Sequence, residues 1–187
     1  MAVQAAAVVT TRDAPLKGYN VFVPQWEFEV IPGEKVVLNG TIEEVHNQLH
    51  EINPDYGFSS ALKVTEPQQA MQLYQQSAHR GNIFQGSTIY CHGFVLGNRY
   101  LIWLALLYLN DVKGTPVNSA GPGNCGRVSC GYGAAVWWCN DDTAPKQLNS
   151  FKDIADGAAH GLNSCGYWDA EKSVSTQAFI RITGTSF

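Results

Sequence analysis

The chain has few charged residues and no run of basic ones. Charged side chains make up 15% of its 187 residues, against about 25% in a typical soluble domain, and the formal net charge is −4. Nucleic-acid-binding domains gather Lys and Arg on one face. Because no such cluster exists here, we expect no nucleic-acid partner. No stretch approaches the roughly 20 apolar residues that a membrane span needs, so we also expect no membrane span.

Several motifs of cofactor and nucleophile chemistry are also missing. The sequence has no Cys-x-x-Cys pair and no G-x-S-x-G nucleophile elbow, and Gly121-Pro122-Gly123 lacks the Lys and helix of a phosphate loop. His46 and His50 stand at helical spacing without the Glu of a zinc-binding helix. A solvated helix face is therefore favoured over a metal site. We expect neither a metal nor a cofactor.

The cysteines and the first residues bear on the compartment. The five cysteines favour two disulfides and one unpaired thiol, and the alternative is five buried thiols in a cytosolic protein. Val3-Gln4-Ala5 resembles the small-residue end of a signal peptide. We interpret residues 1–17 as a flexible leader that keeps this remnant, and residues 18–187 as a single domain. Asn39-Gly40-Thr41 is a glycosylation sequon, so we expect a glycan on Asn39 and a secretory or extracellular location.

Local patterns predict an α+β fold, a two-layer α/β sandwich with a largely antiparallel sheet and packed helices. Capping boxes begin helices at Thr41 and Ser150, and ten apolar residues predict a buried helix over 100–109. A further helix is predicted within the Gln-rich stretch 67–79. The predicted strands cover 21–31 with an interruption at Pro24, 87–94, a hairpin of 127–130 with 134–140, and 175–183.

The aromatic residues are the main candidates for binding. Trp103, Tyr108, Trp137 and Trp138 could line an apolar substrate cavity, and the alternative is a packed core. Trp137 and Trp138 are adjacent on a predicted strand, so at most one faces the helices. Asp141-Asp142 could place carboxylates at a pocket rim, although a turn that ends the strand is the simpler interpretation.

Longer motifs carry a family resemblance. The segments PGNCGRVSC at 122–130 and AVWWCND at 135–141, followed by a capped helix that ends at Cys165, are similar to a group of small secreted fungal proteins. VPQWEFEVIPG at 23–33 and LNGTIEE at 38–44 are similar too. Many members look like effector or killer-toxin-like proteins. Within the group, the chain also resembles the fungal hetero-Diels–Alderases of tropolone–sesquiterpenoid biosynthesis, which are cofactor-free, disulfide-bonded and glycosylated.

This resemblance implies a pericyclase that joins a tropolone quinone methide to a humulene-type sesquiterpene. Such a reaction needs two apolar partners held face to face and donors on the tropolone oxygens. Our candidates for the donors and the acid–base pair are Tyr90, His92, Tyr132 and Arg181. We expect an enclosed apolar pocket with few charges, lined by aromatics of the sheet and of helix 100–109. The alternative is a secreted effector or toxin-like binding protein, and a hydrolase ranks third because no nucleophile–base pair is visible.

The predicted path of the last helix suggests a disulfide pairing. A helix from Ser150 to Leu162 runs back over the sheet, so we expect Cys139 to pair with Cys165. By elimination, Cys91 would then pair with Cys125 or Cys130, which leaves one buried thiol.

Overall fold

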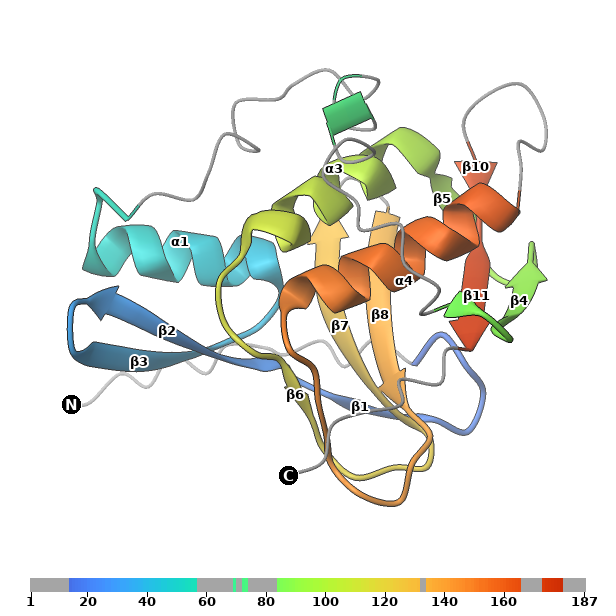
Figure 1. The fold of residues 1–187 in the computed structure, drawn as a ribbon, viewed down its shortest axis with the longest axis horizontal. Helices are drawn as coiled ribbons and strands as arrows, with labels where there is room; N and C mark the ends of the chain where they lie inside the picture. Colours follow the sequence, from blue (N-terminus) through green and yellow to red (C-terminus); the bar gives the residue numbers. More distant parts are fainter. Residues whose placement is uncertain are drawn as a thin grey trace, which may run out of the picture.

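The fold is α+β, as the sequence patterns predict. The computed structural model describes residues 14–56, 69, 72–73, 84–131, 134–165 and 173–179. Figure 1 shows helices gathered on one side of a small central sheet. The described helices are α1 (Ile42–Ile52), α3 (Arg99–Asp111) and α4 (Phe151–Ser164). Most of the Gln-rich stretch 67–79, and residues 1–13 of the expected leader, lie outside the described residues.

The central sheet has the strand order β1-β7-β8. β1 (Asn20–Phe22) runs parallel to β7 (Asn124–Gly131), and β7 pairs antiparallel with β8 (Ala134–Asn140). The β7–β8 hairpin expected from the sequence is confirmed. No other strand of the described residues pairs with the far side of β8, so β8 is an edge strand.

The remaining strands form short antiparallel pairs around this sheet. β2 pairs with β3, β11 with β4, β10 with β5, and β6 with β9. Their bounds are β2 (Gln25–Ile31), β3 (Glu34–Asn39), β4 (Thr88–Cys91), β5 (Gly97–Asn98), β6 (Val117–Asn118), β9 (Lys146–Gln147), β10 (Ser173–Val174) and β11 (Thr176–Phe179).

Two strand predictions need correction at their ends. The strand expected over 87–94 stops at Cys91, because His92 has a positive φ of 61° that breaks the extended backbone. The strand expected over 175–183 starts at Thr176, and β11 is described only as far as Phe179.

Capping residues set the starts of the helices. At both predicted capping boxes the side chain three positions on accepts the N–H of the cap: Glu44 bonds Thr41 N at 2.7 Å, and Asp153 bonds Ser150 N at 3.0 Å. Asn98 caps α3, where its Oδ1 accepts the N–H of Tyr100 at 3.0 Å. These bonds satisfy donors that a helix start otherwise leaves open.

The core lies between the helices and the sheet. Trp26 of β2 stacks on Phe151 at the start of α4, with ring centroids 4.3 Å apart. Trp103 of α3 is fully buried, and so are Leu49 of α1 and Leu106 of α3. Glu43 of α1 accepts hydrogen bonds from the Ser129 hydroxyl and from the Cys130 amide, which anchors α1 to β7.

Two disulfides are present, as expected, but their pairing differs from our prediction. Cys91 pairs with Cys165 and Cys125 with Cys139, while Cys130 belongs to neither bridge. The proposed Cys139–Cys165 bond is wrong because α4 packs on α3, β11 and β4 rather than on β8. The end of α4 therefore meets Cys91 on β4. Two such bridges are compatible with a secreted protein.

The helix cap and the sequon can be tested separately. Asn39 is exposed, whereas Thr41 is buried and caps α1. We expect Thr41→Ala to remove both the cap and the glycan and to lower the free energy of unfolding by about 1 kcal/mol. Asn39→Gln should remove only the glycan. Urea unfolding of both variants, made without glycosylation, checks the cap, and equal stabilities would contradict it. A mass unchanged by deglycosylation of host-secreted protein would contradict the glycan.

The pairing of the cysteines makes a second prediction. Non-reducing peptide mapping should recover Cys91 joined to Cys165 and Cys125 joined to Cys139. Because the Cys91–Cys165 bridge closes a loop of 74 positions, the double variant Cys91→Ala/Cys165→Ala should lose about 2–5 kcal/mol of stability. Cys130→Ala is the control and should leave both bridges intact. A peptide that joins Cys139 to Cys165 would show our assignment to be wrong.

Candidate functional site

A cleft of about 1930 Å³ runs along the open edge of β8. All seven residues of β8 line it. Other described parts of its wall are residues 93–97, one side of α4 and residues 174–179. It is half-open rather than enclosed, and α3 contributes only Ile102. The enclosed pocket that we expected against helix 100–109 is therefore not seen among the described residues, and a half-open cleft lies beside the edge of the sheet instead.

The cleft exists because α4 is held away from β8. The N-terminal end of α4 is fixed by the Trp26–Phe151 stack, and its C-terminal end by the Cys91–Cys165 bridge. Gly161 allows α4 to pack closely on β11, since a Cβ there would lie 2.5 Å from the Thr176 hydroxyl oxygen. These three contacts hold α4 against β2, β4 and β11 and leave a space beside β8.

The adjacent tryptophans of β8 both line the cleft. Trp138 also packs against the core. The ring of Trp137 lies 6.0 Å from the Arg127 guanidinium, within the range of a cation–π contact. Both indoles are half-buried. The cleft therefore has apolar, aromatic surface along β8.

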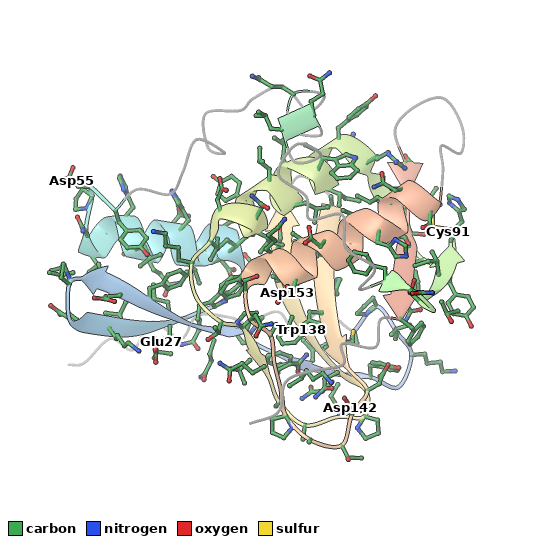
Figure 2. The ribbon with its side chains drawn as sticks, viewed as in Figure 1. Glu27, Asp55, Cys91, Trp138, Asp142 and Asp153 are labelled. Atoms are coloured by element: carbon green, nitrogen blue, oxygen red, sulfur yellow. A yellow bond between two sulfur atoms is a disulfide. The ribbon has the colours of Figure 1, made fainter. Side chains whose placement is uncertain are left out.

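Charges gather where β8 ends, which corrects our expectation of a cleft with few of them. Asp141, Asp142, Lys146 and Asp153 line this end. Figure 2 labels Trp138 on β8, Asp153 at the start of α4, and Asp142 in the loop after β8. Asp153 caps α4, so Asp141 and Asp142 are the carboxylates with room to act.

Both of these carboxylates have partners. Lys146 Nζ donates to Asp142 Oδ2 at 2.6 Å, and this hydrogen bond and the positive charge lower the pKa of Asp142. A hydrogen bond to Asp141, together with burial and the Asp141 charge, raises the pKa of Tyr19. This end of the cleft therefore carries an ion pair between Asp142 and Lys146.

The other site candidates do not meet at the cleft. Trp103 is fully buried in the core, and Tyr108 lies edge-on to His46, 6.4 Å away between α3 and α1. Tyr90 is 56% exposed and packs edge-on against Phe179. His92, whose amide donates to Ser175 O at 2.8 Å, does not line the cleft.

Two further candidates, Tyr132 and Arg181, lie outside the described residues. Only Trp137 and Trp138, of the eight residues expected to bind or catalyse, are seen at the cleft.

One polar pair escaped the sequence analysis. The Ser87 hydroxyl and His160 Nε2 lie 2.8 Å apart, and the His160 ring stacks on Phe84. Their separation of 73 positions gave no signal in the sequence. The bond joins α4 to the turn before β4, so it adds to the contacts that hold α4 in place.

Within the described ranges, no helix is both long and apolar enough to cross a membrane. The same residues contain no group of three or more His, Cys, Asp or Glu side chains that could hold a metal ion.

The ion pair at the cleft gives a prediction. Lys146 lowers the pKa of Asp142. The stabilisation from this ion pair is therefore fully present above the ordinary Asp pKa and is lost as the pH falls through the lowered pKa of Asp142. We expect Lys146→Ala to raise the pKa of Asp142 toward its ordinary value in a carboxylate NMR titration. Lys35→Ala, which removes the similar Lys35–Glu27 pair on the β2–β3 hairpin, should leave Asp142 unchanged. An Asp142 titration unaffected by Lys146→Ala would contradict the pair.

Comparisons with protein-family models, curated proteins and solved structures found no match to this chain.

Proposed function

We propose that the protein is a cofactor-free pericyclase that holds two largely apolar partners in the cleft beside β8. The partners suggested by the motif resemblance are a tropolone quinone methide and a humulene-type sesquiterpene. The size and lining of the cleft carry this proposal. Its volume of about 1930 Å³ exceeds the roughly 300–1,000 Å³ of single-ligand sites, which supports binding of two partners at once.

The lining suits such a pair of partners. Trp137 and Trp138 offer aromatic surface, and Val95 and Leu96 offer exposed aliphatic surface. Moving two apolar molecules out of water into the cleft is favourable. Holding them face to face then removes part of the entropic barrier to the reaction. The cycloaddition forms one carbon–carbon and one carbon–oxygen bond and releases nothing, so the cleft needs only to orient the partners.

The charged end suits the step that prepares the quinone methide. A hydroxymethyl-tropolone must lose water, so one group accepts the tropolone proton while another protonates the departing hydroxide. The Asp142 carboxylate and the Lys146 ammonium group, 2.6 Å apart, are one base and one acid on the same side of the cleft. We assign them these roles in place of Tyr90 and His92, which lie away from the cleft.

The alternative, an effector or toxin-like binding protein, has one supporting observation. Val95 is 96% exposed and Leu96 is half-exposed, and both lie at the rim of the cleft. Apolar side chains at a rim favour contact with a partner surface. The same residues would extend the apolar wall around a bound terpene, so they are also compatible with the pericyclase.

Incubation with a hydroxymethyl-tropolone and a humulene-type alcohol tests the proposal. We expect the protein to accelerate adduct formation over the uncatalysed background and to give one stereoisomer, because only a shaped cleft enforces one facial approach. Asp142→Asn should slow the reaction by about 10²-fold. Trp138→Ala should reduce stereoselectivity, because it removes one wall against which a partner lies.

Glu27→Gln is the matched control. Glu27 is an exposed carboxylate paired with a Lys at 2.7 Å, like Asp142, but lies on the β2–β3 hairpin. The Glu27→Gln variant should form the adduct at the wild-type rate. Adduct formation at the background rate, with mixed stereochemistry, would contradict the pericyclase and favour the binding protein.

A further inference from the structure

The disulfide between β7 and β8 shows which way the main chain of β8 points. Cys125 and Cys139 are register partners with their Cα atoms 4.0 Å apart. Directly opposed residues this close form a non-hydrogen-bonded pair, whereas hydrogen-bonded pairs lie about 5.5 Å apart. The N–H and C=O of Cys139 therefore point away from β7. The direction of the main-chain N–H and C=O alternates from one residue of a strand to the next. The N–H and C=O of Trp137, two residues before Cys139, therefore also point away from β7.

These main-chain groups open into the cleft. β8 is the edge of its sheet in the described part of the chain, and Trp137 and Cys139 both line the cleft. An edge strand is usually protected by Lys, Pro or a covering loop, yet β8 reads AAVWWCN and contains no charged residue. The main-chain N–H and C=O groups of Trp137 and Cys139 thus lie at an edge that no charged side chain of β8 protects.

Two polar side chains of the cleft wall, Asn140 and Ser175, are already used to hold the fold. Asn140 Nδ2 donates to Ser119 O and Ala144 O, both at 2.9 Å. The Ser175 hydroxyl donates to Phe94 O and accepts the amide of Phe94. The main chain of β8 therefore supplies donors beside two polar side chains that are already engaged.

We propose that the N–H and C=O of Trp137 bind the paired oxygens of an α-hydroxyketone, the group that a tropolone presents. This inference rests on the proposed function and names what holds its polar partner. The ketone oxygen accepts the Trp137 N–H, and the hydroxyl donates to the Trp137 C=O. Cys139, one pleat nearer Asp141 and Asp142, offers the same pair toward the charged end.

The arrangement has a consequence for reactivity. Main-chain donors in a strand that is fixed by a disulfide do not need to reorganise when charge develops on the bound oxygen. Such preorganised donors stabilise the transition state more than water does. The open edge of β8 would thus act as donor in place of the tyrosine and histidine expected from the sequence.

Tropolone itself is the probe for this proposal, and quenching of Trp fluorescence measures its dissociation constant. Trp137→Ala removes the indole and keeps the N–H, whereas Trp137→Pro removes both. An edge position whose N–H points away from the ladder tolerates Pro. We expect Trp137→Pro to bind tropolone about tenfold more weakly than Trp137→Ala, the loss of one hydrogen bond.

A second variant avoids dependence on proline. Replacing the residue 137 amide by an ester keeps the indole and removes only the N–H, and it should weaken binding by a similar factor. 2-Methoxytropone, which lacks the donating hydroxyl, should bind the wild type more weakly than tropolone does.

Equal binding by Trp137→Pro and Trp137→Ala, with no loss in the ester, would overturn the inference. If the wild type still accelerated the cycloaddition, the proposed function would stand with different donors. A wild type that bound no tropolone and gave only background adduct would overturn both.

Discussion

The cross-strand bridge between Cys125 and Cys139 fixes the relation of β7 to β8, and the geometry of the cleft depends on it. A shift of one residue would turn the side chains of β8 to opposite faces and its amides to the opposite edge. Trp138 would then leave the core, and the N–H of Trp137 would turn toward β7. The bulge between Arg127 and Ser129 lies within the same pairing, so the bridge also holds the register next to an irregular stretch.

The position of α4 then determines whether an edge strand becomes a binding site. Had α4 packed on β8, the strand would be covered and its main-chain groups excluded from ligands. Instead the helix is anchored at both ends to other elements, by Trp26 at one end and by Cys91 at the other. Among the described residues a fixed frame is thus combined with an unpaired strand edge, and the proposed chemistry needs these two properties together.

The fold could be predicted from the sequence where local chemistry decides it. The capping boxes at Thr41 and Ser150, the apolar run of α3 and the β7–β8 hairpin depend on neighbouring residues, and all are present. The disulfide pairing could not be predicted, because it depends on which element α4 packs against. The stop of β4 at His92 was also missed, since a positive φ at a non-glycine residue leaves no mark in a pattern of apolar residues.

The site was harder to predict than the fold, for a physical reason. Side-chain candidates can be read from a sequence, but an open strand edge is a property of topology. Trp137 and Trp138 were found because large aromatics are conspicuous. The direction of the Trp137 amide follows only from its pairing partner and from the absence of a further strand among the described residues. Asp142 was considered at the sequence level but ranked below a simple turn, because the Lys146 beside it is seen only in the fold.

The parallel pairing of β1 with β7 has a consequence for synthesis of the protein. Asn20 pairs with Asn124, so β1 leaves the ribosome long before β7, its partner in the sheet, exists. The β7–β8 hairpin, by contrast, can close as soon as Asn140 has emerged, and its cysteines are near each other in the chain. We therefore expect the sheet to be assembled from its C-terminal strands, with the N-terminal strand added afterwards. During that interval the edge of β7 that later receives β1 is as open as the edge of β8, and folding conditions that delay the docking of β1 would expose both sides of one hairpin to association with other chains.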